Sequence, residues 1–199
     1  MENNINERIL FLIFGLIVLA FFYGIYYTKM ILQKKQGIRT NQIGKRKEKK
    51  LHMVETLMSI ATLGIVVVQL VSIATDWSYL PISARFTGFC IGMVGDIIFF
   101  ISVICMKDSW RAGIPEKDKT KLVTDGIYSF SRNPAFLGFD LMYIGVLLMF
   151  LNPLTAVFSI FAIVMLHLQI LQEEKYMEQT FGKEYVEYKK KTFRYLGRK

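Results

Sequence analysis

Five long apolar blocks, separated by charged segments, constrain this chain more than any other feature of its sequence. A helix needs about 20 apolar residues to cross a hydrocarbon layer of about 30 Å, and inside lipid only a helix or a closed barrel pairs all of its backbone groups. The strict alternation of barrel strands is absent from the blocks. We therefore expect an all-α, polytopic membrane protein with five transmembrane helices, forming one domain over residues 1–199. The expected spans are Ile9–Tyr27, Met53–Ala74, Phe86–Met106, Pro134–Phe150 and Leu154–Leu171.

The fourth and fifth blocks are separated only by Leu151, Asn152 and Pro153. An Asn-Pro step favours a turn, because the residue before a proline is pushed out of the helical region. The short connection predicts that these two helices form an antiparallel hairpin.

Charge is distributed as unevenly as hydrophobicity. The chain has 25 Lys+Arg and 16 Asp+Glu, a net charge of +9, yet 53% of its residues are hydrophobic. That hydrophobicity excludes intrinsic disorder and argues against a soluble nucleic-acid binder. Three segments, residues 29–51, 107–132 and 172–199, hold 23 of the 25 basic residues. The positive-inside rule places them in the cytoplasm and the N-terminus outside, as in a bacterial-type inner membrane or its equivalent.

The C-terminal segment carries an apolar stripe of its own. Met177, Phe181, Tyr185 and Tyr188 recur at spacings of four, four and three, with lysines and arginines after them. This pattern predicts an amphipathic cytoplasmic helix over Glu173–Leu196, lying on the inner membrane surface and held there by anionic lipid.

Ionisable residues inside the apolar blocks are candidates for function, because they are costly in lipid. They are Asp96, Asp140 and His167. Each also has a structural interpretation, as a hydrogen-bonding residue between helices or as an interfacial residue. No pairing of His, Cys or Glu has the spacing of a zinc site, so we expect no metal.

Two further patches border the hairpin. Arg132 stands at the membrane surface just before the fourth block, where a guanidinium could bind a carboxylate or phosphate. Glu173 and Glu174 stand where the fifth block ends. Because the start of one helix of a hairpin lies beside the end of the other, Arg132 is expected to approach the two glutamates, and a shared site is a hypothesis. Gly138 leaves room either for a ligand or for close helix packing.

Three ordered segments make the chain recognisable, and they are Leu122–Tyr128, Ser131–Gly138 and Gln172–Tyr188. With their spacing around a helical hairpin, they resemble the isoprenylcysteine carboxyl methyltransferase and phospholipid methyltransferase superfamily of integral membrane enzymes. The resemblance covers about Trp110–Leu196. It implies that S-adenosylmethionine is the cofactor and that residues 107–199 form the catalytic half. The residues it assigns to the cofactor pocket are Gly126, Tyr128, Arg132, Asn133, Pro134, Gly138, Glu173 and Glu174.

The expected activity is methyl transfer to a lipophilic small molecule or lipid acceptor at the cytoplasmic face. Arg132 would orient a carboxylate acceptor, whereas Asp140 or His167 would assist an amine in losing its proton. The chain has Arg132-Asn133-Pro134 where the carboxyl methyltransferases commonly have Arg-His-Pro, and the acceptor is left open between carboxylate, amine and thiol. The alternatives are a non-catalytic membrane transporter or complex subunit, and a membrane reductase of similar architecture. The oligomeric state is also left open.

Overall fold

The structure, a computed structural model, describes residues 2–43, 48–114 and 120–198. Every regular element in these ranges is a helix, apart from isolated bridges that pair Asn41 with Ala112 and Thr192 with Arg198. The α-helices are α1 (Glu2–Lys35), α2 (Lys49–Thr75), α3 (Ile82–Met106), α4 (Pro134–Met149), α5 (Pro153–Phe181) and α6 (Lys183–Lys191), with 3-10 turns at Lys107–Ser109 and Gly126–Ser129.

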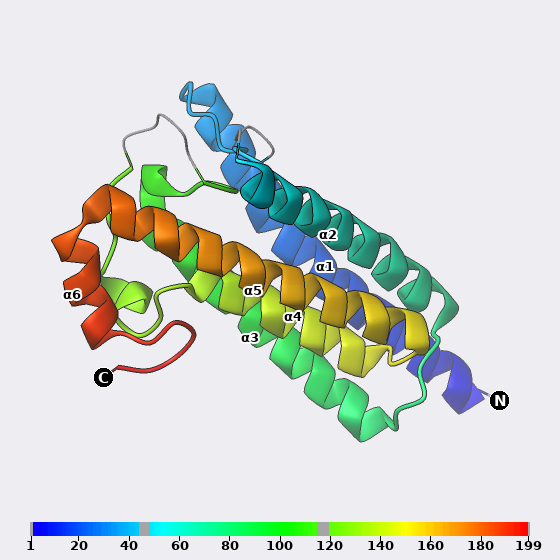
Figure 1. The fold of residues 1–199 in the computed structure, drawn as a ribbon. Helices are drawn as coiled ribbons and strands as arrows, with labels where there is room; N and C mark the ends of the chain where they lie inside the picture. The colour runs from blue at the N-terminus through cyan, green and yellow to red at the C-terminus, as the bar shows by residue number, and fades with distance from the viewer. Residues whose placement is uncertain (1, 44–47, 115–119, 199) are drawn as a thin grey trace.

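The five longer helices run alongside one another in a single bundle (Figure 1). The N-terminus and the turns between α2 and α3 and between α4 and α5 lie at one end. The described residues after α1, the described parts of the segment between α3 and α4, and the C-terminal part with α6 all lie at the other end, which we call the site end. The basic segments therefore gather at one end, as the alternation of charge along the chain requires.

The helical hairpin predicted from Asn152 and Pro153 is confirmed. Helix α4 ends at Met149 and α5 begins at Pro153, with Asn152 as its N-cap. The Asn152 side-chain oxygen accepts a hydrogen bond from the Thr155 backbone N–H at 3.0 Å, which satisfies one of the free donors of the first turn. The turn is thus built from a cap and a proline, as its sequence indicates.

Four of the five expected spans are long enough and apolar enough to cross a membrane: α1, α2, α3 and α5. Helix α4 is apolar, but its 16 residues span only about 24 Å, which is less than the hydrocarbon layer. Among the described residues, four helices rather than the expected five have the length and composition of a membrane span. The helices extend beyond the predicted blocks, since α5 alone continues ten residues past Leu171 to Phe181.

The C-terminal segment differs from the expected single amphipathic helix over Glu173–Leu196. Residues up to Phe181 continue α5, and Gly182 then breaks the helix with a φ of 53°. A separate α6 of nine residues follows, and the chain leaves it at Thr192. Met177 and Phe181 therefore lie on a different helix from Tyr185 and Tyr188. A left-handed φ is readily adopted by glycine, which explains the break.

Glycines let α3 and α4 pack closely. Gly88, Gly92 and Gly95 on α3 face Gly138 and Gly145 on α4. A Cβ built on Gly145 would come within 2.4 Å of the Gly92 nitrogen, so no larger residue fits without moving a backbone. Small residues allow such an approach in membrane helices, where van der Waals packing replaces the hydrophobic effect.

A buried arginine joins the elements at the end opposite the site. The Arg85 Nε donates a hydrogen bond to the Met149 carbonyl at 2.8 Å, and its Nη2 pairs with Asp76. The guanidinium also lies 3.9 Å from the centre of the Phe11 ring. A cation on an aromatic face beside a carboxylate is compensated away from water. Arg85 therefore ties α1, the α2–α3 turn and the end of α4 together.

The glycine contact leads to a stability prediction. We expect Gly145→Ala to destabilise the protein by about 1–3 kcal/mol through overpacking, which lowers the Tm by several degrees at about 2–4 °C per kcal/mol. The matched control is Gly24→Ala, because a Cβ on Gly24 meets nothing within 4 Å. Thermal unfolding of both variants in detergent checks this. Equal melting temperatures would show that the α3–α4 contact is not tight.

Candidate active site

A cavity of about 350 Å³ opens at the site end of the bundle. Its walls come from every α-helix and from the segments before α2 and between α3 and α4. The lining includes residues far apart in sequence, such as Tyr23 on α1, Trp110 after α3 and Tyr188 on α6. The cavity therefore needs both halves of the chain, although only the C-terminal half carries recognisable motifs.

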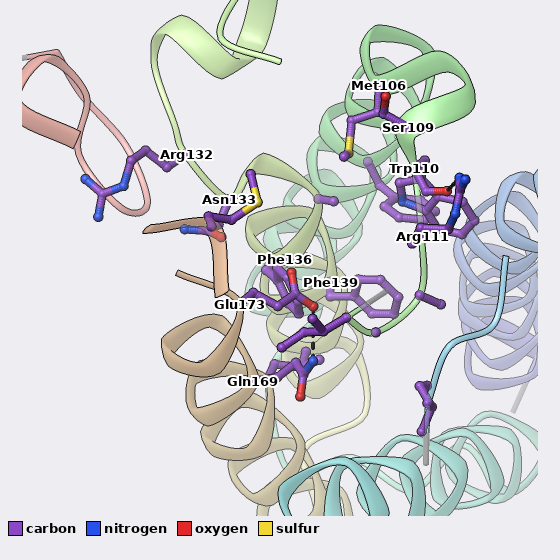
Figure 2. Close-up of a pocket in the computed structure, with 18 of the residues that line it drawn as sticks. Met106, Ser109, Trp110, Arg111, Arg132, Asn133, Phe136, Phe139, Gln169 and Glu173 are labelled. Atoms are coloured by element: carbon purple, nitrogen blue, oxygen red, sulfur yellow. Dashed lines mark hydrogen bonds between the residues drawn. The ribbon is translucent and has the colours of Figure 1, made fainter. Parts of the chain in front are cut away.

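An amide and a carboxylate that are hydrogen-bonded to each other line this cavity from α5. Figure 2 shows Gln169 and Glu173 joined by a hydrogen bond, in which Gln169 Nε2 donates to Glu173 Oε1 at 3.1 Å. Gln169 is 1% exposed, and its side-chain oxygen is buried without a hydrogen-bond partner among the described residues. A buried acceptor without a donor costs free energy unless a ligand supplies one. This pair therefore suits a ligand group that is cationic or carries N–H or O–H donors.

Aromatic side chains form much of the remaining wall. Phe136 and Phe139 line the cavity from α4 (Figure 2). Phe139 packs edge-on against Phe99, with ring centres 5.2 Å apart, and Tyr26 packs edge-on against Trp110 at 5.5 Å. Such pairs hold rings rigidly and present π faces that attract cations.

Arg132 and Glu174 meet, as the hairpin geometry predicts. Arg132 Nη2 donates to Glu174 Oε1 at 2.7 Å, and Nη1 donates to the Thr192 carbonyl at 2.6 Å. Both side chains are at least nine-tenths buried. In Figure 2 the Arg132 side chain points away from the Gln169–Glu173 pair. Both Nη atoms are thus bound to the protein, whereas Nε is buried without a hydrogen-bond partner among the described residues.

Residues 192–198, which we call the C-terminal strap, bond to the residues around the Arg132–Glu174 pair. Arg194 grips Glu174 with two hydrogen bonds of 3.1 and 2.9 Å, which hold the pKa of Arg194 above its usual value. Asn133 donates both to Glu174 and to the Arg194 carbonyl. The Arg132 backbone N–H donates to the Phe193 carbonyl at 3.0 Å. Glu174 therefore connects the start of α4, the end of α5 and the strap.

Tyrosines from the 3-10 turn and from α6 lie beside the Arg132–Glu174 pair and the strap. The Tyr188 hydroxyl donates to the Tyr128 carbonyl at 2.5 Å and reaches the Ser131 carbonyl at 3.3 Å. Burial raises the pKa of Tyr128 and of Tyr188 above the usual value and that of Tyr185 to about 12. All three hydroxyls therefore remain protonated hydrogen-bond donors at neutral pH.

Asp140 and His167 do not line the cavity. His167 Nδ1 instead lies 2.6 Å from the hydroxyl of Tyr195 in the strap, and the two rings are stacked. Burial raises the pKa of Tyr195, and the nearby Asp140 carboxyl adds to the rise. His167 is therefore joined to the strap, and Asp140 lies near the same tyrosine. Asp96 is fully buried on α3 and also lies outside the cavity.

Of the other residues expected to bind the cofactor, some line the cavity and others do not. Tyr128 and Asn133 line the cavity together with Arg132, Glu173 and Glu174. Gly138 does not, because a Cβ there would come within 2.8 Å of the Phe99 Cβ and 2.9 Å of the Gly95 carbonyl. Of its two predicted uses, close helix packing is the one observed. Gly126 begins the 3-10 turn with a φ of 61°, and Pro134 is buried in the first turn of α4.

Several lining residues carried no functional signal in the sequence. Tyr23, Tyr26 and Met58 lie in apolar blocks where they read as ordinary lipid-facing or core residues. Only the packing of α1 and α2 against the hairpin turns them toward the cavity. Among the described residues, no group of three or more His, Cys, Asp or Glu could hold a metal ion.

Comparison with known proteins adds a family to this geometry. Residues 88–179 match the model of the isoprenylcysteine carboxyl methyltransferase (ICMT) family. A protein-S-isoprenylcysteine O-methyltransferase of Saccharomyces cerevisiae is 46% identical over 71 residues, which are 35% of this chain and 30% of the yeast protein. Protein-S-isoprenylcysteine O-methyltransferase B of Arabidopsis thaliana is 38% identical over 38% of this chain and 39% of its own. The segment 88–179, slightly under half of the chain, is therefore similar to the isoprenylcysteine carboxyl methyltransferase family.

The likeness to this family extends further in fold than in sequence. A probable protein-S-isoprenylcysteine O-methyltransferase of Oryza sativa subsp. indica is 31% identical over 53% of this chain and 57% of its own. The matched part thus spans about 30–57% of these relatives' length. The solved structure of the eukaryotic intramembrane Ras methyltransferase ICMT covers 94% of this chain and 66% of its own, with a TM-score of 0.64 and 17% identity. Together with the apolar helices, the shared fold marks an integral membrane protein.

The buried ion cluster leads to a second prediction. Glu174→Gln leaves the buried Arg132 without its counter-charge and releases Arg194, so we expect a loss of about 3 kcal/mol of stability. The strap should also become more sensitive to trypsin at its basic residues. Thermal unfolding and limited proteolysis measure both effects. Glu187→Gln is the control, since it removes only the exposed pair with Lys190 and should change neither. Unchanged cleavage in Glu174→Gln would refute the strap's dependence on Glu174.

Proposed function

We propose that this protein transfers a methyl group from S-adenosylmethionine to the carboxylate of an isoprenylcysteine-like lipophile at the cytoplasmic face of the membrane. The observation that carries the proposal is the cavity built around the family's segments, with an acidic and amide pair on one wall and aromatic rings on the others. The relatives, named as isoprenylcysteine O-methyltransferases, support the carboxyl branch of the resemblance rather than the phospholipid branch.

The chemistry of the lining fits the methyl donor. S-adenosylmethionine, when bound, supplies a methyl carbon activated by its sulfonium, and the carbon–sulfur bond breaks as the acceptor oxygen bonds to that carbon, its electron pair passing to sulfur. Glu173 and the unpaired oxygen of Gln169 suit the cationic and N–H-bearing groups of such a donor. The rings of Phe136, Phe139 and Trp110 suit its cation and its flat base.

The acceptor side of the cavity has a different character. On the α1–α2 side the lining residues Tyr27 and Leu63 are 58% and 69% exposed on the outer surface of the bundle. Met58 and Val66 add apolar wall between them. A lipophilic chain lying in the bilayer could enter the cavity here without crossing water. The residues hold and orient the two reactants, and no covalent nucleophile is needed.

A transporter is the competing function, and the packing disfavours it. Beyond the cavity the bundle is filled by fully buried side chains such as Phe11, Met149 and Phe150, and Arg85 joins the helices at the far end. A polar path through Asp96 and Asp140 would have to cross this core. The basic loops and the C-terminal strap, which share the site end, are proposed to lie in the cytoplasm with the N-terminus outside.

Donor binding is the first test. We expect S-adenosylhomocysteine to raise the Tm of the detergent-solubilised protein, and Glu173→Gln to weaken that binding about tenfold by removing a charged hydrogen-bond acceptor from the cavity. Glu187→Gln, on the exposed face of α6, is the control. The second arm is transfer of labelled methyl from S-adenosylmethionine to S-farnesyl-N-acetylcysteine, read by mass spectrometry. No thermal shift and no labelled ester would refute the proposed function and favour a transporter or subunit.

A further inference from the structure

Two tyrosines that line the cavity have buried hydroxyls without hydrogen-bond partners among the described residues. Tyr23 comes from α1 and Tyr143 from α4, and both line the cavity. Each phenol is therefore a buried O–H donor that lacks an acceptor among the described residues. Leaving such a donor buried is costly unless a ligand accepts from it.

Apolar groups surround this pair. Phe139, whose ring centre is 6.1 Å from that of Tyr143, and Leu166 and Met58 line the same cavity. A carboxylate placed among them would lie in a medium of low polarity and would need hydrogen-bond donors. The side chain that sequence reasoning assigns to this task is Arg132, but its Nη atoms bind Glu174 and the strap. Unlike those Nη atoms, the hydroxyls of Tyr23 and Tyr143 have no hydrogen-bond partner among the described residues.

The unpaired acceptor of Gln169 and the unpaired hydroxyls of the two tyrosines favour different reactants. Gln169 offers a buried acceptor beside the Glu173 carboxylate, which attracts cations and repels anions. The tyrosine pair offers O–H donors, which do the reverse. A cationic donor and an anionic acceptor would therefore prefer different walls of one cavity, with the reacting atoms between them.

Building on the proposed function, we propose that Tyr23 and Tyr143 bind the carboxylate of the methyl acceptor and thereby select an acid over its neutral analogues. Each hydroxyl donates to the carboxylate, whose free oxygen is left to attack the methyl carbon. No proton is transferred, because the acid is already ionised at neutral pH. This assigns a function to Tyr23, which lies outside the segment that matches the family.

The test uses the full-length protein in detergent with S-farnesyl-N-acetylcysteine as acceptor and its carboxamide as competitor. We expect the wild type to bind the acid at least tenfold more tightly than the carboxamide, as hydrogen bonds to a charged group allow. Tyr23→Phe and Tyr143→Phe should each raise the KM for the acid about tenfold and reduce this preference, while affinity for S-adenosylhomocysteine stays unchanged. Tyr79→Phe, which removes an exposed phenol at the opposite end of the bundle, is the control.

The outcomes separate the two proposals. Melting temperatures and S-adenosylhomocysteine affinity identify a variant that has lost its fold, and Tyr23→Phe, on the less buried of the two residues, is the milder change. An unchanged KM and an unchanged preference for the acid in both folded variants would overturn the role of the tyrosines. A wild type that methylates an amine but not the acid would overturn it as well, with donor binding intact. A wild type that transfers no methyl group would refute the proposed function itself.

Discussion

The buried carboxylate of Glu174 is the contact on which the shape of the site depends. It accepts hydrogen bonds from Arg132 at the start of α4, from Arg194 in the strap and from Asn133 between them. A buried charge with this many donors is compensated, whereas any partner left alone would be strongly destabilising. Glu174 thereby holds the C-terminal strap to the hairpin, and Tyr188 and Thr192 join the 3-10 turn to the same wall of the cavity.

Glu173 and Glu174 are adjacent on α5 but make different contacts. Successive residues of a helix point about 100° apart, so Glu173 and Glu174 cannot face the same neighbours. Glu174 lies on the side of His167, seven residues earlier, and faces the strap. Glu173 lies on the side of Gln169 and faces the cavity (Figure 2). The acidic pair therefore consists of Glu174, which holds the strap, and Glu173, which bonds to Gln169 in the cavity lining.

Much of this arrangement follows from patterns within single segments. Apolar blocks and an Asn-Pro step are sufficient to predict the bundle and the hairpin, and the hairpin alone brings Arg132 to Glu174. What could not be predicted depends on contacts between distant segments. The strap draws His167 toward Tyr195, the packing of α3 takes up Gly138, and α1 brings Tyr23 into the cavity. An ionisable residue in an apolar block signals importance, but it does not say which neighbour it meets.

The central claim is that the N-terminal helices line the acceptor side of a methyltransferase cavity that opens to the bilayer. The most direct measurement is photocrosslinking with an S-prenylated N-acetylcysteine that carries a diazirine on its isoprenoid chain, followed by mass spectrometry of the labelled peptides. The account predicts labelling on α1 and α2 around Tyr27, Leu63 and Val66, with competition from unlabelled acceptor. Competed labelling confined to the segment between α3 and α4 or to the strap would contradict it.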